Sequence, residues 1–417
     1  MGIDLRKTNI YEVNLRQYTS EGTLRAFELE LPRLKQMGVD IVWFMPITPV
    51  SVLNRKGTLG SYYACADYKS INPEFGDLQD FKDVVKKAHD LKIKVIIDWV
   101  ANHTGWDHVW TKSNPEFYQK NEYNQFTERN GWEDVIDLNY FNLDMQQAMV
   151  DCMKYWVVET GIDGFRCDMA MLVPLEFWRK AKEQLDQIKK MIWLGECEDL
   201  NYFEVFDMLY AWEWMHTTRR IATHKLNKYP LSDLIYSCQN RTPAGKYFLY
   251  FTSNHDENSW NGTEYERYGE YARFYAVLSA LMPSGIPLVY SGQELPLMHR
   301  LKFFDKDLIN WHDHLPRLDF FYNSILSLRK NFEDRVEYEL NKLVELDEIF
   351  SMRVYDFDSR LDVILIMNLS SEVREFTLTV KDLSSEYKNL LTREIVHLSG
   401  DDKMRLEGCD FRIYQSF

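Results

Sequence analysis

The sequence predicts an α/β fold: a (β/α)8 TIM barrel with a small domain inserted after its third strand and a C-terminal all-β sandwich domain. Three observations predict it. Strand-like runs alternate with helical patterns over about the first 330 residues, one long polar segment interrupts the alternation, and the helical patterns cease after about residue 335. An open doubly wound sheet is the alternative, but no GxGxxG or P-loop motif follows the first strand.

The elements of the barrel follow one another from the N-terminus. Residues 10–15 have the pattern of a strand, and residues 24–37 carry apolar side chains at helical spacing. The apolar run at 41–44 predicts a strand buried on both faces. Asp77 is placed to cap a helix that runs to about residue 91. The further expected elements are strand 95–98, helix 145–159, strand 164–167, helix 175–188, strand 192–195, a strand near 208–212, strand 247–252, helix 268–281 and strand 287–290.

Two regions depart from this alternation. The segment from His103 to about Asp137 follows the third strand, which places it at the C-terminal, ligand-binding face of a barrel. Beyond the barrel, strand-like runs at 349–355, 361–368, 375–380 and 411–417 follow one another without long helices and predict a small sandwich. The expected division is therefore 1–102 and 139–334 for the barrel, 103–138 for the insertion (domain B) and 335–417 for the sandwich (domain C).

Composition excludes several classes of function. The chain has 417 residues and a net charge of −15, which opposes binding to nucleic acid or to an anionic membrane surface. No apolar run is long enough for a membrane-spanning helix. The first residues lack the apolar core of a secretion signal, so we expect a cytoplasmic protein, or a secreted or periplasmic one from which a leader was removed.

Polar side chains follow four of the expected barrel strands. These residues are Asp98 with Asn102 and His103, Arg166 with Asp168, Glu196, and His255 with Asp256. The carboxyl ends of barrel strands converge on one cleft, so these side chains are expected to meet there. A single aspartate in such a place would be read as a helix cap or a structural ion pair. Four strand ends together predict a catalytic cleft.

Glycoside hydrolysis is commonly catalysed by a pair of carboxyl groups that flank the scissile bond. One must be ionised to attack the anomeric carbon, and the other must be protonated to donate to the leaving oxygen. Arg166 lies two residues before Asp168 and therefore on the same face of the strand. It would hold Asp168 ionised by a charge-assisted hydrogen bond. Cys167 would point into the layer between barrel and helices.

Four sequence motifs make this interpretation specific. They are Asp98-Trp99-Val100-Ala101-Asn102-His103, Gly164-Phe165-Arg166-Cys167-Asp168-Met169-Ala170, Trp193-Leu194-Gly195-Glu196 and Phe251-Thr252-Ser253-Asn254-His255-Asp256. In this order the chain resembles the α-amylase family of retaining glycoside hydrolases, glycoside hydrolase family 13. Segments 63–68, 72–76 and 285–294 support the resemblance, which spans essentially the whole barrel.

The resemblance implies a role for each residue. Asp168 would be the nucleophile, Glu196 the general acid/base and Asp256 the third carboxylate, which stabilises the transition state. Glu196 would need a raised pKa, for which burial away from Arg166 is the expected cause.

The remaining family positions imply substrate contacts. Arg166 would orient Asp168, and Asp98 would anchor the network around Arg166 and Tyr63. Tyr63 would stack under the sugar in the reacting subsite, and His103 and His255 would hydrogen-bond that sugar.

No cofactor is implied for the chemistry, but Asn102 matches a position that often binds a structural Ca²⁺ in that family. The alternative is that Asn102 closes its turn by a hydrogen bond.

The chain also departs from the family pattern. Many endo-acting amylases continue after the nucleophile with Ala-Lys-His, where this chain has Ala170-Met171-Leu172. The family's His-Gly before the stacking tyrosine is replaced by Ser61-Tyr62. The missing Lys and His lead us to expect short oligosaccharides as better substrates than polymeric starch.

The leading hypothesis is a retaining glycosidase that cleaves α-glucosidic bonds of malto-oligosaccharides or α-glucans. The alternative is a glucanotransferase-like transglycosylase of the same fold. A non-catalytic amylase-like protein is the third hypothesis, which the four retained side chains Arg166, Asp168, Glu196 and Asp256 disfavour.

Overall fold

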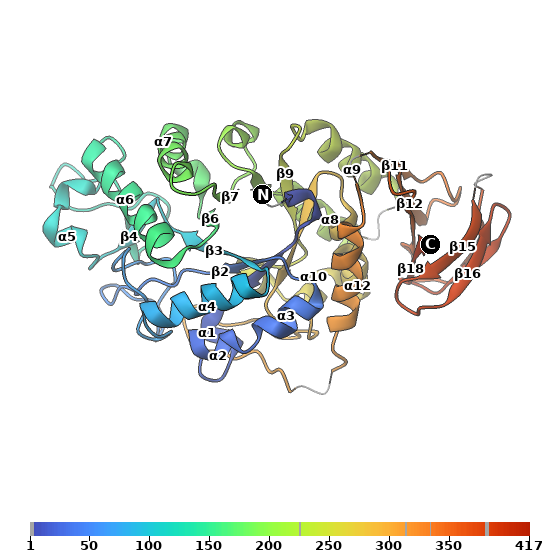
Figure 1. Cartoon of the computed structure of the whole chain (residues 1–417), viewed down its shortest axis with the longest axis horizontal. Helices are drawn as coiled ribbons and strands as arrows, with labels where there is room; N and C mark the ends of the chain where they lie inside the picture. Colours follow the sequence, from blue (N-terminus) through green and yellow to red (C-terminus); the bar gives the residue numbers. More distant parts are fainter. Residues whose placement is uncertain (1–3, 225–226, 313–314, 334, 380–382) are drawn as a thin grey trace.

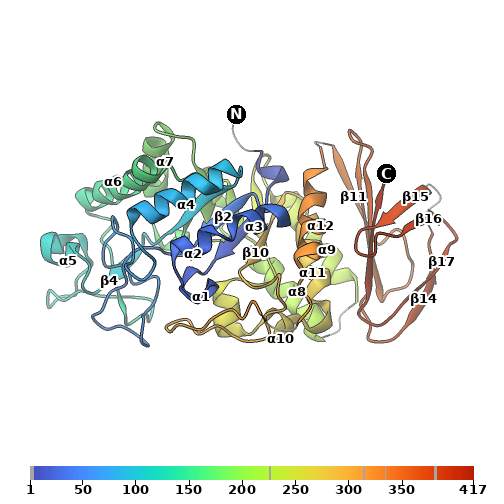
Figure 2. The same ribbon diagram turned by 60° about the horizontal axis from the view of Figure 1, so that its bottom comes forward.

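The predicted barrel is present and closed. The computed structural model describes residues 4–224, 227–312, 315–333, 335–379 and 383–417. Eight parallel strands close in the order β1-β10-β9-β8-β7-β6-β3-β2, with helices around them (Figures 1 and 2). The strands are β1 Ile10–Val13, β2 Ile41–Phe44, β3 Lys94–Trp99, β6 Gly164–Cys167, β7 Ile192–Gly195, β8 Met208–Tyr210, β9 Tyr247–Tyr250 and β10 Gly285–Tyr290. The closed order confirms the barrel and excludes the open sheet.

Strand β6 shows how the pleat sorts side chains between two environments. Phe165 and Cys167 pack in the cluster between barrel and helices. Arg166 lies between them and therefore faces the barrel interior, next to Asp98 in the register of β3. A Cβ at Gly164 would lie 2.1 Å from the carbonyl oxygen of Ile192. Strands β6 and β7 can therefore approach closely only because residue 164 is a glycine. The predicted direction of Cys167 is confirmed.

Two predicted helices are interrupted. The stretch 24–37 forms α2 Leu24–Glu28 and α3 Leu31–Met37, because Pro32 is tolerated in the first turn of a helix and not in its interior. The stretch 268–281 is divided into α10 Glu264–Tyr268, the 3₁₀ turn η6 Gly269–Tyr271 and α11 Ala272–Leu281. Gly269, with φ +57°, ends α10 in a conformation that glycine adopts without cost.

The other helices lie where the pattern predicts them or in the connections. Asp77 caps α4 Leu78–Asp90 in a reciprocal capping box with Asp80. The remaining helical elements are η1 Leu5–Lys7, α1 Leu15–Tyr18, α6 Leu143–Thr160, η3 Ala170–Leu172, α7 Leu175–Asp186, η4 Leu200–Glu204, α8 Trp212–His224, α9 Tyr229–Arg241, the π-turn η5 Glu257–Asn261 and α12 Asp319–Lys330. Within the described ranges, each helix is too short or too polar to cross a membrane.

The segment between β3 and α6 has secondary structure of its own. It contains β4 His103–Gly105, α5 Trp110–Ser113, η2 Pro115–Phe117 and β5 Val135–Asp137. Strands β4 and β5 pair antiparallel, with His103 opposite Asp137. The insertion forms the end of the molecule remote from the C-terminal sheets (Figure 1).

The C-terminal region is all-β and has two sheets. One has the order β11-β12-β13-β18-β15-β16, and β14 and β17 form the other. The strands are β11 Val336–Leu340, β12 Ile349–Asp356, β13 Asp362–Asn368, β14 Arg374–Thr377, β15 Ser384–Asn389, β16 Ile395–Ser399, β17 Lys403–Leu406 and β18 Phe411–Ser416. The expected strand 375–380 ends earlier, and its last residue lies outside the described residues.

Strand β13 explains why this region is attached to the barrel. All seven of its residues are buried. Ile364 and Ile366 pack against the β14–β17 sheet, whereas Val363 and Leu365 belong to the core cluster shared with the barrel helices.

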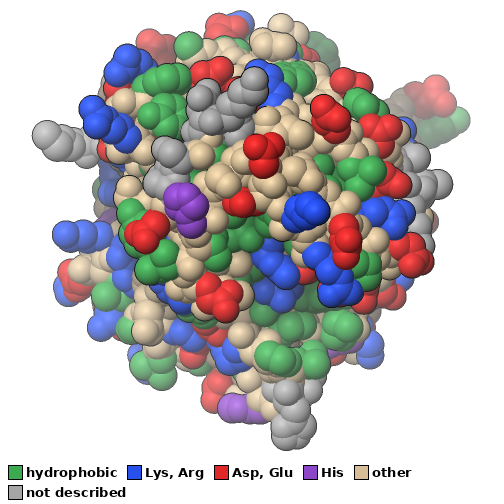
Figure 3. Space-filling view, turned by 90° about the vertical axis from the view of Figure 1, so that its right-hand side faces the viewer, with side chains coloured by type: hydrophobic (Ala, Val, Ile, Leu, Met, Phe, Trp, Pro, Cys, Tyr) green, Lys and Arg blue, Asp and Glu red, His purple; other side chains and the backbone are tan. Residues whose placement is uncertain are grey.

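Acidic and basic side chains are interspersed over the outer face of this end of the molecule (Figure 3).

Candidate active site

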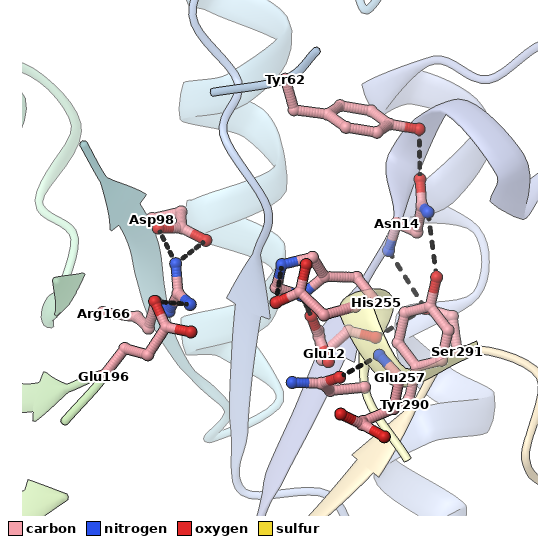
Figure 4. A network of polar contacts seen from close by, with 12 residues as sticks. Glu12, Asn14, Tyr62, Asp98, Arg166, Glu196, His255, Glu257, Tyr290 and Ser291 are labelled. Atoms are coloured by element: carbon pink, nitrogen blue, oxygen red, sulfur yellow. Dashed lines mark hydrogen bonds and ion pairs between the residues drawn. The ribbon is translucent and has the colours of Figure 1, made fainter. Parts of the chain in front are cut away.

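One buried guanidinium binds the carboxylates at the ends of three barrel strands. Nη1 of Arg166 donates to Asp98 Oδ1 and to Asp168 Oδ1, both at 2.9 Å. Nη2 lies 2.8 Å from Glu196 Oε2 (Figure 4). The guanidinium is fully buried, so these ion pairs are shielded from water. The structure thus brings together four of the residues that the sequence motifs singled out.

The environment of Glu196 favours the protonated form of its carboxyl group. Burial raises its pKa to about 8, and the neighbouring Asp168 adds to this effect, although Arg166 opposes it. The amide N–H of Met169 donates to Oε2 at 2.9 Å and fixes the carboxyl group. The expectation that Glu196 is buried away from Arg166 is wrong, because the two are paired. Burial and the second carboxylate outweigh the cation.

A second network surrounds His255. Its Nδ1 lies 2.5 Å from Glu12 Oε1, and its Nε2 lies 3.1 Å from Asp256 Oδ2 (Figure 4 shows the first pair). Burial opposes the protonation of His255, but Asp256 and Glu12 raise its pKa well above the ordinary value. The hydroxyl of Tyr63 lies 2.7 Å from His255 Nε2 and donates to Asp98 at 3.1 Å, which links the two networks.

His103 is the neutral imidazole of the site. It is buried, and burial lowers its pKa. The side-chain amide of Asn102 donates to His103 Nδ1 at 3.1 Å, so the ring proton lies on Nε2. This hydrogen bond orients the ring beside the cavity, where its edge contacts Trp132 at 5.3 Å between ring centroids.

The surroundings of Asn102 do not fit a calcium ion. Ca²⁺ takes six to eight oxygen ligands, usually with several carboxylates. Within the described part of the chain, no group of three Asp, Glu, His or Cys side chains could hold a metal ion. The Asn102 amide is hydrogen-bonded to His103, and its backbone carbonyl accepts from Leu138. These contacts support the alternative function of Asn102 in closing the turn.

A cavity of about 480 Å³ lies over the two networks. Six predicted residues line it, namely Tyr63, His103, Asp168, Glu196, His255 and Asp256. Arg166 and Asp98 do not line the cavity, but they contact the lining residues Asp168 and Tyr63 from below it. Sequence reasoning missed Lys56, Trp132, Asp134, Trp260, Phe303 and Phe304, which also line it and lie outside the barrel strands. It also missed Glu12, although a charged residue within an apolar barrel strand is a signal that could have indicated it.

Comparison with known proteins gives the family. Residues 7–134 and 117–317 match the model described as alpha amylase, catalytic domain. The chain therefore belongs to the α-amylase family.

Relatives within the family bear different names. "Alpha-amylase 3" of Dictyoglomus thermophilum is 30% identical over 227 residues, which are 46% of this chain and 44% of that protein. This chain thus spans less than half the length of that relative. A 4-alpha-glucanotransferase of Thermotoga neapolitana is 28% identical over 311 residues, 66% of this chain and 67% of that protein. The solved structure of a noncanonic maltogenic alpha-amylase from Thermotoga neapolitana has a TM-score of 0.89 and 29% identity, covering 99% of both chains.

The first prediction concerns Glu12, which holds His255 from beneath the cavity. Glu12→Gln keeps the shape of the side chain and removes its charge. We expect the pKa of His255 to fall, because the lost hydrogen bond to a charged group contributes about 1.5–3 kcal/mol to the charged form. A ¹⁵N NMR titration measures this pKa, with the resonance assigned by its loss in His255→Asn. Glu183→Gln, on the exposed side of α7, is the matched control. An unchanged titration of His255 would show that Glu12 does not stabilise the imidazolium.

Proposed function

We propose that this chain is a retaining glycosidase that cleaves α-glucosidic bonds of malto-oligosaccharides or α-glucans by double displacement. The observation that carries the proposal is the pairing of Asp168 and Glu196 with one guanidinium. Arg166 binds Asp168 Oδ1 at 2.9 Å, whereas burial raises the pKa of Glu196 to about 8. The site thus offers a carboxylate and a protonated acid side by side.

The chemistry follows from these two groups. Asp168 attacks the anomeric carbon while Glu196 donates its proton to the glycosidic oxygen, and the bond between that carbon and that oxygen breaks. The product is a glycosyl ester of Asp168. Glu196, now a carboxylate, accepts a proton from water as the water oxygen attacks the anomeric carbon. This step releases the sugar and restores both side chains.

The other residues would bind the sugar during these steps. Tyr63 presents its ring to the sugar face, and Asp256, His103 and His255 bind its hydroxyl groups. The barrel at 1–102 and 139–334, domain B at 103–138 and domain C at 335–417 are the division we propose. The cellular location stays a prediction from the sequence. The proposed chemistry depends neither on it nor on a calcium ion at Asn102, which the surroundings of that residue do not fit.

The proposed roles predict a trapped intermediate. With α-glucosyl fluoride, whose leaving group needs little protonation, Glu196→Gln should still allow attack by Asp168. It should then stall, because no base remains to activate water. Intact-protein mass spectrometry should show a glycosyl adduct on Asp168 in this variant and none in Asp168→Asn. An adduct in Asp168→Asn but not in Glu196→Gln would mean that the two roles are reversed.

A transglycosylase is the second candidate, favoured by the similarity to the 4-alpha-glucanotransferase over two thirds of both chains. The first half-reaction would be identical, and a sugar would replace water as acceptor. We predict that maltoheptaose yields only shorter oligosaccharides, as resolved by chromatography of the products. Oligosaccharides longer than maltoheptaose would identify the transglycosylase instead.

A further inference from the structure

The loops after β2 and β10 lie on the side of the barrel opposite Glu196. In the closed strand order, β1 lies four strands away from β7 in either direction and has β2 and β10 as its neighbours. Glu196 directly follows β7. Any contact between the two loops therefore forms over β1, at the end of the cavity remote from the acid.

These two loops are joined. The amide of Leu59 donates to the carbonyl oxygen of Phe304 at 2.9 Å. The hydroxyl of Thr58 donates to Asp305 Oδ1 at 2.6 Å. Gly57 has φ +63°, and a Cβ there would lie 2.5 Å from Phe304 Cβ, so the contact depends on a glycine. Residues 57–59 and 304–305 together form what we call the arch.

Lys56 extends the arch to the insertion between β3 and α6. Its Nζ lies 3.2 Å from Asp134 Oδ1. Asp134 is only 5% exposed, and Lys56 is its one ion-pair partner among the residues that the structure describes. Both side chains line the cavity. A buried carboxylate paired to a single cation favours a fixed bridge, because separation would leave the charge unpaired.

An aromatic wall connects the arch to the reacting centre. The ring of Phe303 lies parallel to that of Tyr63, with centroids 6.2 Å apart and an interplanar angle of 14°. Trp260 and Phe304 pack against Phe303 at centroid distances of 5.3 and 5.2 Å. The wall offers apolar faces to a sugar ring and continues from Tyr63 to the arch.

The side next to Glu196 is different. The turn after β6, which adjoins β7, exposes Met171 at 42% and Leu172 at 36%. Residues 169–174 of this turn include no charged side chain, so they form no ion pair comparable to the Lys56–Asp134 bridge. The part of a glucan chain beyond the leaving oxygen would lie on this side, where the turn carries no such bridge.

The position of the sugar connects these observations. Its C1 must lie at Asp168 and Glu196, and C4 lies across the ring from C1, so O4 points toward the arch. We infer that the arch and the Lys56–Asp134 bridge close the cavity around the non-reducing end of the substrate, so that cleavage occurs near chain ends and not within long chains. This inference rests on the proposed function. The remaining N–H donors of Lys56 are available to hydroxyl groups of the terminal sugar.

The test compares two maltoheptaosides that differ at the non-reducing end. One has free O4 and O6 hydroxyls, and in the other an ethylidene group bridges them. We expect the wild-type kcat/KM for the free substrate to exceed that for the blocked one by about 100-fold or more, because the closed end rejects added bulk. Lys56→Ala/Asp134→Ala should lower this ratio by about tenfold. The control Lys82→Ala/Glu159→Ala removes an ion pair of 2.9 Å between α4 and α6 and should keep the wild-type ratio.

Three other results would each contradict a different part of this inference. Similar wild-type kcat/KM values for the two substrates would overturn chain-end recognition. A wild-type ratio in the double variant, shown to be folded by circular dichroism, would overturn the role of the bridge. The near-isosteric Lys56→Met/Asp134→Asn replaces it if the alanine variant does not fold. Cleavage of neither substrate would overturn the proposed function, and the inference with it.

Discussion

The buried guanidinium of Arg166 is the interaction on which the site depends. An unpaired charge in the barrel interior would cost several kcal/mol or more, and Asp98, Asp168 and Glu196 offset that cost. Three carboxyl groups around one cation cannot all be ionised without net repulsion in a region of low dielectric constant. Burial is the largest cause that raises the pKa of both Asp98 and Glu196, and repulsion from Asp168 adds to it. Burial and the excess of carboxylates over cations together thus provide the protonated acid.

Buried charges also set the protonation state of His255, but here the carboxylates stabilise the charged form of a base. Here one imidazolium lies between the carboxylates of Glu12 and Asp256, and the pair of anions keeps the ring charged despite its burial. Tyr63 connects the two clusters through its hydroxyl group. The floor of the cavity therefore consists of two cation-centred networks, while its walls come from loops that the barrel holds above them.

Sequence reasoning worked where short motifs determine structure and failed where distant loops meet. The order of the strands and the cluster of Asp98, Arg166, Asp168 and Glu196 could be predicted, because strand ends of a barrel converge whatever the loops do. The arch could not, since it needs the contact of residue 57 with residue 304, which no local pattern encodes. The pairing of Glu196 with Arg166 was missed for a similar reason. Its geometry depends on how β6 and β7 are brought together at Gly164.

The protonation of Glu196 tests most directly whether burial and the excess of carboxylates outweigh Arg166. Infrared difference spectroscopy of wild type against Glu196→Gln isolates the carbonyl band of this protonated carboxyl group. Because its pKa is raised to about 8, Glu196 should stay protonated at every pH below that value. The band should therefore persist at neutral pH and disappear as the pH rises through about 8. A band already lost near pH 4.5, the ordinary value for a glutamate, would show that Arg166 ionises Glu196 and that the explanation is wrong.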